Sequence, residues 1–563
     1  MATINPATKA WRWEPSPESP RTTGGLPAPR RDDPAGRRAT TVLNASTLGA
    51  LGPGVAVPGY DRRAVAPAIV HIGVGGFHRA HQAMYLDRLM NRGEALDWGV
   101  CGVGLLPGDR HMKDVLDLQD GLYTLVLKHP DGRLEASVVG SVVAYLFAPD
   151  DPEAVIVQMA APVTRIVSLT ITEGGYPVHP VTGEFQADDP AVRADLAPGA
   201  VPSTVFGLVT EALIRRRERG LPPFTVMSCD NIQGNGEVAR RAFVGFARLR
   251  DAALGDWVER EVRFPSSMVD RITPATTDAD RDLVAAVFGI QDEWPVVCEP
   301  FEQWVLEDDF GQGRPPLEQV GVRLVEDVAP YELMKLRLLN GGHQALCHLG
   351  RLAGHWHAHE AAQDPLFAQF LLDYLDHEAA PTLPDVPGVD VAAYTRALLA
   401  RFANAQVRDP LDRLRADASD RVPRWLGPVA RSQLASGGEV RRCALVIAAW
   451  ARCAEGVDEG GEPLDVVDRR RGAVMSAAAA HPQDPTAFLA QRDLFGDLVD
   501  DTRFVAAYTA ALESLRERGA RATVEALVGP VSAGARGPAG PTGPGAVAPG
   551  VPQATSSPSP PRA

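Results

Sequence analysis

Short apolar runs alternate with helical patterns in the first half of the chain. Runs rich in β-branched and apolar residues occupy 68–74, 98–106, 122–128, 136–147, 165–172 and 224–231, and a segment of helical character follows the first of them. Strands that alternate with helices are typical of a parallel sheet with helices on its faces. This half therefore predicts an α/β domain.

The hydrophobic pattern changes near Pro330. Long segments with apolar residues at helical spacing follow, and β-branched runs become rare; examples are 331–354, 364–379, 391–404 and 502–519. This spacing is typical of amphipathic helices. We therefore expect an all-α domain after the α/β domain.

Both ends of the chain are poor in apolar residues. Residues 1–42 are rich in Pro, Gly, Arg and Ser, and the chain from about 529 is rich in Gly, Pro, Ala and Ser. Such segments bury too little surface to offset the entropy of ordering. The predicted organisation is a disordered tail at 1–42, an α/β domain at 43–329, a helical domain at 330–528 and a disordered tail at 529–563.

Composition narrows the class of protein. Acidic residues outnumber basic ones by 71 to 56, and the net charge of −15 argues against a nucleic-acid or anionic-membrane surface. No stretch approaches the ~20 apolar residues that span a bilayer, and the N-terminus lacks a secretory pattern. The six cysteines are scattered without a C-x-x-C pair, which favours free thiols in a reducing compartment. We expect a cytoplasmic protein.

The basic residues are almost all arginine. Only Lys9, Lys113, Lys128 and Lys335 are lysines. Lysine can lose its proton near neutral pH when its pKa is lowered, and arginine cannot. Lys9 lies in a predicted tail and Lys128 beside a predicted turn, so both are expected to face solvent. Lys335 lies in an apolar segment and is the candidate for proton transfer.

A glycine-rich turn follows the first predicted strand and opens a helix. Glycine lets the backbone approach a pyrophosphate at a helix N-terminus. The match to G-x-G-x-x-G is imperfect because His78 stands at the third glycine, and a turn without a ligand is the alternative. The candidate cofactor-binding residues are Gly73, Val74, Gly75, Gly76, Phe77, His78 and Arg79.

An acidic residue after the second strand is expected to bind the adenosine ribose and to favour NAD over NADP. Asp109 is the candidate, although it lies further from the glycine turn than the usual ~20 residues. The neighbouring Arg110 leaves room for NADP.

The segment that begins at Lys335 carries polar residues at helical spacing. On an α-helix, Asn340 would lie ~140° and His343 ~80° from Lys335 around the axis, so all three can line one side of a cleft. Polar groups inside an apolar helix are costly to bury without a purpose. The alternative is a lysine whose ammonium reaches solvent and a histidine that is an ordinary core residue.

Several motifs resemble those of the long-chain mannitol dehydrogenases, and the resemblance covers nearly all of residues 43–528. It implies a Rossmann-type N-terminal domain and a C-terminal domain like that of 6-phosphogluconate dehydrogenase, with the substrate between them. It also implies a metal-independent, monomeric enzyme that oxidises D-mannitol to D-fructose with NAD. The motifs are IVHIGVGGFHRAHQAMYLDRL, SLTITEGGY, SCDNIQGNG, MVDRITPATT, EPFEQWVLED and KLRLLNGGH.

The resemblance assigns roles to residues at matching positions. Lys335 is implied to be the general base, and Asn231 and Asn340 are implied to hold the substrate oxygen. His343 would position the substrate and assist Lys335. This set suits hydride transfer, because a desolvated lysine can act as a base near neutral pH and two amides can bind the oxygen that zinc binds in other alcohol dehydrogenases.

Further positions match the family's substrate site. Asp270 and Arg413 are implied to bind sugar hydroxyls, and Glu332 to pass the proton of Lys335 to solvent. Arg421 replaces the lysine usual in its neighbourhood, which puts that contact in doubt. Ordinary surface carboxylates are the alternative for Asp270 and Glu332.

Other functions stay open at this stage. A D-arabinitol 4-dehydrogenase or a fructuronate or tagaturonate reductase belongs to the same family, and a uronate enzyme needs an additional cation that Arg413 or Arg421 would supply. A non-catalytic nucleotide-binding sensor is a third possibility. His355, His357 and His359 suggest a metal cluster, but no clear third ligand accompanies the first and last of them, so no metal is predicted.

Overall fold

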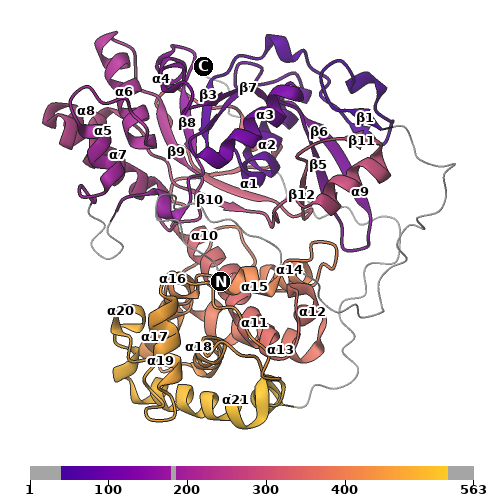
Figure 1. Ribbon diagram of the computed structural model, residues 1–563, viewed down its shortest axis with the longest axis vertical. Coiled ribbons are helices and arrows are strands. Elements are labelled where there is room, and N and C mark those ends of the chain that lie inside the picture. Colours follow the sequence, from indigo (N-terminus) through magenta and orange to yellow (C-terminus); the bar gives the residue numbers. More distant parts are fainter. Residues whose placement is uncertain (1–39, 179–184, 530–563) are drawn as a thin grey trace, which may run out of the picture.

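The structure is a computed structural model that describes residues 40–178 and 185–529. The predicted tails therefore lie almost entirely outside the described residues. Thr41–Val42, which the prediction places in the first tail, form strand β1 and pair in parallel with β11 (Ile290–Gln291). The described chain forms an α/β body and a helical body, which are the upper and lower parts of Figure 1.

A parallel sheet is the centre of the α/β body. Its strand order is β7-β4-β3-β8-β9, and all neighbouring pairs are parallel. Because the chain proceeds outward from β3 in both directions, the order reverses between β3 and β8, which is where open α/β sheets bind ligands. The strands are β3 (Ile69–Ile72), β4 (Val100–Gly104), β7 (Val142–Phe147), β8 (Ile166–Leu169) and β9 (Thr225–Ser228).

Helices cover this sheet (Figure 1). Parallel strands need crossover connections, and helices supply them. The sheet is buried from both sides, and β3, β8 and β9 are buried along their whole length. The helices of this body are α1 (Gly76–Ala80), α2 (Gln82–Asn91), α3 (Arg110–Leu118), α4 (Pro152–Ala160), α5 (Pro190–Leu196), α6 (Val205–Glu218), α7 (Asn235–Arg250), α8 (Ala252–Glu261) and α9 (Asp278–Phe288).

The predicted run at 122–128 and the first part of the run at 136–147 do not join the parallel sheet. The run at 122–128 forms β5 (Tyr123–Lys128), which pairs antiparallel with β6 (Leu134–Val139) across a short turn. A short turn permits only antiparallel pairing, so these strands form a hairpin in a second sheet of order β12-β5-β6-β2. The remaining strands are β2 (Val55–Ala56), β12 (Val296–Cys298), and β10 (Ser267–Asp270), β13 (Gln303–Glu307) and β14 (Arg323–Val325), which form a third sheet.

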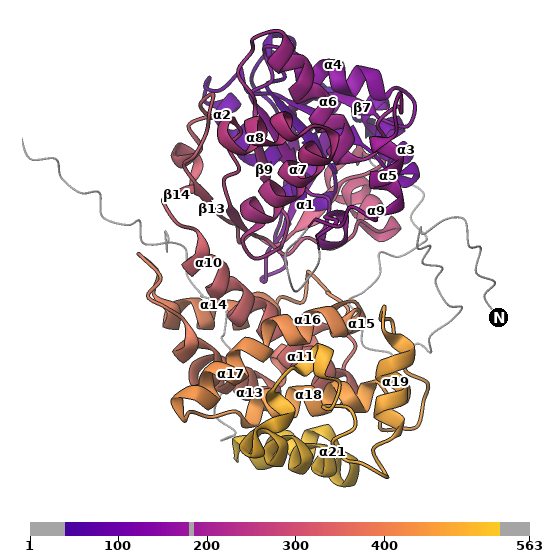
Figure 2. The ribbon, with the colours of Figure 1, turned by 90° about the vertical axis from the view of Figure 1, so that its left-hand side faces the viewer.

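The helical body begins with α10 (Ala329–Met334), which extends from the α/β body (Figure 2). Its centre is α18 (Arg441–Cys453), which is buried along nearly its whole length, and α21 (Thr502–Val528) packs across it. The other helices are α11 (Gly341–Leu352), α12 (Ala358–Gln363), α13 (Pro365–Asp373), α14 (Val391–Phe402), α15 (Leu411–Arg415), α16 (Ala418–Trp425), α17 (Gly427–Ser436), α19 (Arg471–Ala479) and α20 (Arg492–Phe495).

Two segments of this body are π-helices: η6 (Lys335–Asn340) and η7 (Tyr374–Ala379). They contact each other, because the Tyr374 hydroxyl donates to the Arg337 carbonyl at 3.2 Å. Gly341 permits this approach, since a Cβ there would lie 2.5 Å from the Tyr374 hydroxyl. A π-helix is rare and is found mostly as a single turn, frequently at functional sites.

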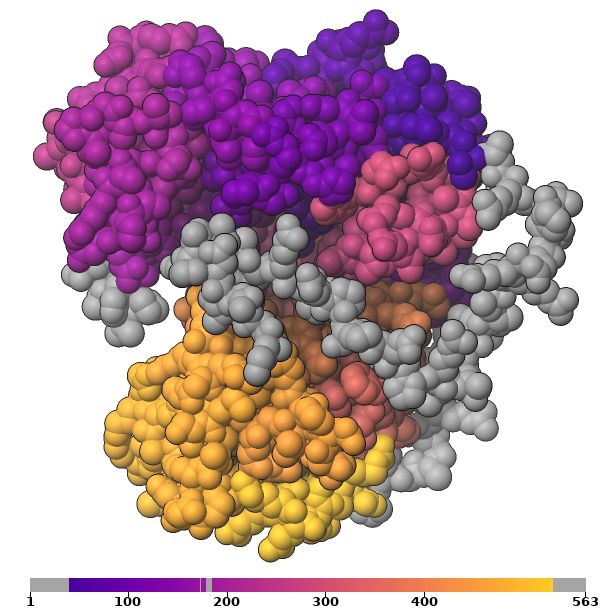
Figure 3. All heavy atoms as spheres, in the orientation of Figure 1, coloured from indigo at the N-terminus to yellow at the C-terminus, as the bar shows by residue number. Residues whose placement is uncertain are grey.

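The two bodies form separate lobes that meet across a narrower middle (Figure 3). Within residues 40–178 and 185–529, no helix is both long and apolar enough to cross a membrane. All six cysteines are buried free thiols: Cys101, Cys229 and Cys298 in the α/β body, and Cys347, Cys443 and Cys453 in the helical body.

Candidate active site

The candidate site residues of the α/β body lie at one edge of the parallel sheet. The glycine turn follows β3, Asp109 follows β4 and Asn231 follows β9. Because the carboxyl ends of parallel strands share an edge, the fold brings these three segments to the same side of the sheet, beside the switch point between β3 and β8.

Gly73 is required by the packing of the two central strands. Its φ is +96°, and a Cβ there would lie 2.2 Å from the Thr170 carbonyl oxygen at the end of β8. His71 also links these two strands, because its ring nitrogens lie 2.8 Å from Ser168 Oγ and 3.0 Å from Thr170 Oγ1. The glycine therefore has a structural reason that does not depend on a ligand.

The rest of the predicted cofactor segment divides into accessible and buried residues. Gly75 is exposed, and Gly76 and Phe77 are partly exposed at the start of α1, where a pyrophosphate would meet backbone N–H groups. Val74, His78 and Arg79 are buried.

These three buried side chains contact protein. The His78 ring stacks on His71 with centroids 3.5 Å apart, and Arg79 donates to the Trp294 carbonyl. Val74 packs with Met112 and Leu116. A role for these side chains in cofactor binding stays a prediction, and the described contacts account for them by packing.

Asp109 is held in a fixed orientation beyond β4. Its Oδ2 accepts hydrogen bonds from the N–H groups of Leu105 and Leu106, at 2.9 and 2.8 Å. Arg110 turns away to form an ion pair with Asp150, over the ring of Phe147. The carboxylate is therefore the nearer candidate for a ribose hydroxyl, and the guanidinium that would suit a 2′-phosphate is occupied.

Lys335 joins the two bodies. It is the first residue of η6 and is only 8% exposed, and its Nζ donates to Asn231 Oδ1 at the end of β9. The prediction that Lys128 faces solvent is wrong. Its side chain is 15% exposed and forms an ion pair with Asp280 at 2.7 Å. Lys113 pairs with Asp117 on α3, and Lys9 lies outside the described residues.

Glu332 lies one turn before Lys335, in α10. Its Oε2 accepts a hydrogen bond from the Gly234 N–H at 3.0 Å, and Oε1 is buried with no hydrogen-bond partner among the described residues. Burial raises the pKa of Glu332 to about 7, although the Gly234 N–H opposes the rise. A small cavity beside it is lined by Asp230, Asn231, Ile232, Ser267, Met268, Val269, Lys335 and Leu336.

The π-helix corrects the angular argument from the sequence. An α-helix would place Asn340 ~140° from Lys335 around the helix axis. In η6 the hydrogen bonds run from residue i to residue i+5, so Asn340 lies about one turn after Lys335 and near the same face. Asn340 is 6% exposed, and its Oδ1 has no hydrogen-bond partner in the part of the chain that the structure describes. A buried polar atom without a partner is costly unless a ligand satisfies it.

His343 follows in α11 and stacks on Phe402, with ring centroids 4.1 Å apart. Desolvation, and then the nearby guanidinium groups of Arg413 and Arg401, hold the pKa of His343 well below its usual value. The imidazole is therefore neutral and presents one donor and one acceptor.

The predicted substrate-binding residues already have partners. Both carboxylate oxygens of Asp270 accept from Arg401, at 2.8 and 2.9 Å. Arg413 is half exposed and forms a fork with Asp409, and Arg421 donates to the backbone carbonyls of Arg413 and Leu414. Their roles toward substrate stay predictions.

Sequence reasoning missed Arg401. It lies near the end of an amphipathic helix, where an arginine usually faces solvent, yet its side chain is 7% exposed. Its second partner, Glu299, stands in the segment EPFEQWVLED that carries part of the family resemblance, and this was the available signal.

The histidines at 355–359 contact acidic side chains. His355 Nε2 lies 3.5 Å from Asp364 and His357 Nδ1 lies 3.0 Å from Glu360. Among the described residues, no three His, Cys, Asp or Glu side chains come together in a way that would hold a metal ion.

Comparison with known families covers both bodies. The model of the mannitol dehydrogenase Rossmann domain matches residues 67–319, and the model of the mannitol dehydrogenase C-terminal domain matches residues 327–516. The predicted resemblance and the predicted fold class are thereby confirmed.

Individual relatives agree with the domain models. A mannitol 2-dehydrogenase of Aspergillus fumigatus is 46% identical over 489 residues, which are 85% of this chain and 97% of the relative. A mannitol 2-dehydrogenase of Pyrenophora tritici-repentis is 46% identical over 502 residues, 88% of each chain.

Two solved structures superpose on most of the chain. The Pseudomonas fluorescens mannitol 2-dehydrogenase, in a ternary complex with NAD and D-mannitol, has a TM-score of 0.81 and 45% identity and covers 87% of this chain and 99% of its own. A D-sorbitol dehydrogenase in substrate-free form has a TM-score of 0.76 and 37% identity, with coverage of 86% and 100%.

Proposed function

Because the chain belongs to the mannitol dehydrogenase family, we propose that it oxidises D-mannitol to D-fructose with NAD⁺ and that Lys335 is the general base. The chain is an NAD-dependent polyol dehydrogenase. The observation that carries the proposal is the contact of Lys335 with Asn231 between the two bodies, at the start of a π-helix that ends at Asn340, whose Oδ1 has no partner among the described residues.

The residues present suit the cofactor. Gly75 and Gly76 offer accessible backbone at the switch point, and Asp109 offers an oriented carboxylate for the ribose. NAD⁺ held there would accept the hydride that leaves the substrate carbon. No residue of the proposed reaction needs a metal, because amide groups bind the substrate oxygen.

The protein's own side chains take the hydroxyl proton of the substrate and donate hydrogen bonds to its oxygen. Lys335 in its neutral form takes the hydroxyl proton as the C–O bond becomes a carbonyl. Asn231 turns its Oδ1 to Lys335, so its Nδ2 remains as a donor for the substrate oxygen, and Asn340 Nδ2 supplies a second donor. Glu332, with a pKa of about 7, can receive a proton from Lys335 and release it beside the small cavity.

Other substrates of the same family are the main alternatives. A uronate substrate needs a free cation, but Arg413 is paired with Asp409 and Arg421 is bonded to backbone carbonyls. These contacts favour a neutral polyol. A nucleotide sensor without catalysis would not need a base beside two amides.

A substrate panel tests the proposal. Steady-state rates are measured with D-mannitol, D-arabinitol, D-sorbitol and fructuronate, each with NAD(H) and NADP(H). D-Mannitol with NAD⁺ is expected to give the highest kcat/KM. The proposal fails if D-mannitol is inert while another substrate of the panel turns over.

Two further properties are proposed. We propose a monomer from the family resemblance and a cytoplasmic location from the scattered, buried free thiols. Light scattering coupled to size-exclusion chromatography would show the mass of one 60.1 kDa chain if the first is right.

A further inference from the structure

The last turn of α14 contacts two predicted substrate-site residues at once. We propose that it is a positioning element, in which Arg401 orients Asp270 and Phe402 orients His343. This inference rests on the proposed function, because it concerns how the polyol site is held in shape. Neither Arg401 nor Phe402 is proposed to touch substrate.

Arg401 makes four charge-assisted hydrogen bonds across the two bodies. Nη1 and Nη2 donate to the two oxygens of Asp270 at 2.8 and 2.9 Å, and Nε and Nη2 donate to the two oxygens of Glu299 at 3.0 and 2.7 Å. The three side chains are between 2% and 7% exposed. Bidentate pairs of this kind fix orientation as well as position.

The surroundings of Arg401 hold this arrangement rigid. The guanidinium lies 3.8 Å above the centre of the Phe301 ring, and Glu299 Oε1 also accepts from the Ile272 N–H at 2.7 Å. Tyr394, from the same helix, places its hydroxyl 3.4 Å from Asp270 Oδ2. Lysine cannot replace the planar fork, because an ammonium is a point charge with a different geometry.

Phe402, the next residue of α14, contacts the second predicted substrate-site residue, His343. Its ring stacks on the imidazole of His343, at 4.1 Å and an interplanar angle of 24°. Consecutive residues on a helix point ~100° apart. One turn of α14 therefore reaches Asp270 in the α/β body and His343 in the helical body.

This arrangement has a consequence for substrate binding. Asp270 Oδ2 accepts from both Arg401 and Tyr394, whereas Oδ1 accepts from Arg401 and keeps a second lone pair that is available to a substrate hydroxyl. Because Arg401 holds the carboxylate in one orientation, this lone pair is preorganised. A displacement of about 1 Å in a group that positions substrate can cost about 10²-fold in rate.

The first test is Arg401→Lys, which keeps the charge and removes the fork. We expect kcat/KM for D-mannitol to fall about 10²-fold, mainly through a higher KM, while the Kd of NADH stays close to that of the unmodified enzyme and the Tm falls because a buried charge network is disturbed. Phe402→Leu should give a smaller change in the same direction.

A double-mutant cycle separates positioning from a general structural role. If Arg401 acts through Asp270, then Arg401→Lys should add little to the loss caused by Asp270→Asn alone. Additive losses, or a loss of NADH binding equal to the loss in kcat/KM, would overturn the inference. If Arg401→Lys does not fold, the same cycle is run with Glu299→Gln, which keeps a hydrogen-bond acceptor for Arg401.

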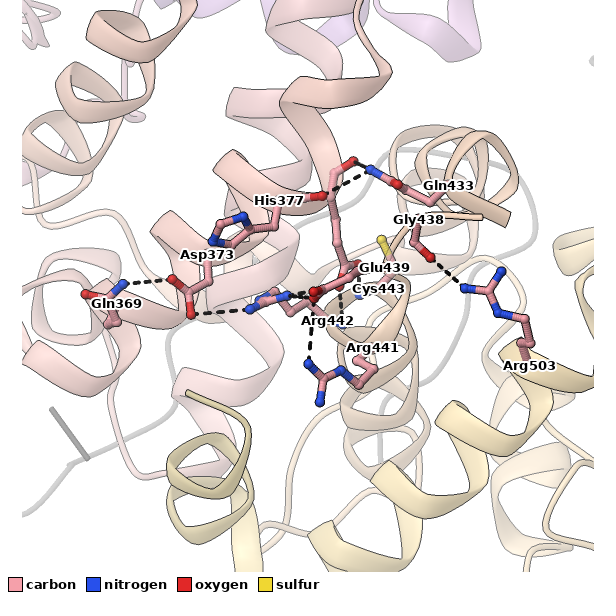
Figure 4. Close-up of polar contacts among 11 residues, drawn as sticks. Gln369, Asp373, His377, Gln433, Gly438, Glu439, Arg441, Arg442, Cys443 and Arg503 are labelled. Atoms are coloured by element: carbon pink, nitrogen blue, oxygen red, sulfur yellow. Dashed lines mark hydrogen bonds and ion pairs between the residues drawn. The ribbon is translucent and has the colours of Figure 1, made fainter. Parts of the chain in front are cut away.

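Arg442→Lys is the matched control. Arg442 is also 7% exposed and pairs with Asp373, Glu378 and Glu439 within the helical body (Figure 4). It should lower the Tm and leave KM and kcat unchanged. If the unmodified enzyme turns over no polyol, the proposed function fails as well. If it oxidises D-mannitol and Arg401→Lys matches its kinetics, only the inference about α14 fails.

Discussion

The two π-helices of the helical body share an unusual backbone and differ in how their polar groups are satisfied. In η6, Asn340 keeps a buried oxygen without a partner among the described residues. In η7, the carboxylate of Glu378 accepts from the N–H groups of Arg442 and Cys443 at 2.7 and 2.8 Å, and Gln433 donates to the Glu378 carbonyl at 2.6 Å (Figure 4).

This difference shows which feature marks a functional segment. Both helices carry buried polar residues, so neither the helix type nor burial distinguishes them. Glu378 is satisfied at the N-terminus of α18 and serves packing. The segment with polar atoms left for a ligand, η6, is the one expected to act on substrate.

Removal of the proposed base should have the largest effect. Lys335→Ala in η6 is expected to lower kcat by roughly 10³- to 10⁴-fold, because the variant lacks the group proposed to take the hydroxyl proton. Steady-state kinetics measure the loss, and quenching of protein fluorescence by NADH should show that the cofactor still binds. Lys128→Ala, which breaks the pair with Asp280, is the control with unchanged kcat. A normal rate in Lys335→Ala would remove this lysine from the mechanism.

The amide of Asn340 should come next. Asn340→Ala is expected to lower kcat by about 10²- to 10³-fold, which is the usual cost of losing one donor to the reacting oxygen. Gln433→Ala removes an amide that serves η7 instead, and it should lower stability and leave kcat intact. Equal kinetic losses in both variants would erase the distinction between the two helices.

Glu378→Gln tests whether η7 has only a structural role. An amide cannot accept from both backbone N–H groups of α18, so the free energy of unfolding should fall by about 1–3 kcal/mol. Urea denaturation measures the loss, and KM and kcat should stay unchanged. A kinetic defect without a loss of stability would show that η7 also takes part in catalysis.

Glu332→Gln should have the smallest effect, and it should depend on pH. The pKa of Glu332 is raised from its ordinary 4.5 to about 7 in the folded protein, so the stability that this carboxyl contributes is fully present below about pH 4.5. It is lost as the pH rises through about 7. In the variant, this pH-dependent part of the urea midpoint should disappear.

The same substitution also reports on the proton path. If Glu332 is the relay, the pH profile of kcat should have an inflection near pH 7 that is lost in Glu332→Gln. Profiles that coincide for the two proteins would argue against a role for Glu332 as a relay.

The fold was largely predictable because burial leaves a clear pattern. The apolar runs at 68–74 and 224–231 contain β3 and β9, and the amphipathic segments after Pro330 are helices. The pairing of β5 was not predictable in this way, because an apolar run does not show which strand it joins. The short turn at its end was the informative feature.

The candidate site residues could be named from the sequence, and their roles stay predictions; their geometry was less predictable. The glycine turn and the polar residues of η6 stand in recognisable segments. The π-helix could not be predicted, because the spacing of apolar residues over only six positions does not distinguish i→i+4 from i→i+5 hydrogen bonding. Arg401 was missed because a charged residue on an amphipathic helix gives no sign of a buried partner from another domain.

The buried cysteines offer a way to watch the molecule open without altering it. Three lie in each body, and burial raises the pKa of every one of them, to about 12 for Cys101, Cys229, Cys298 and Cys453. A thiol reagent can therefore modify them only when the surrounding structure opens. The order in which mass spectrometry finds them labelled would reveal whether one lobe unfolds before the other, and a bound polyol that bridges the lobes would slow both sets together.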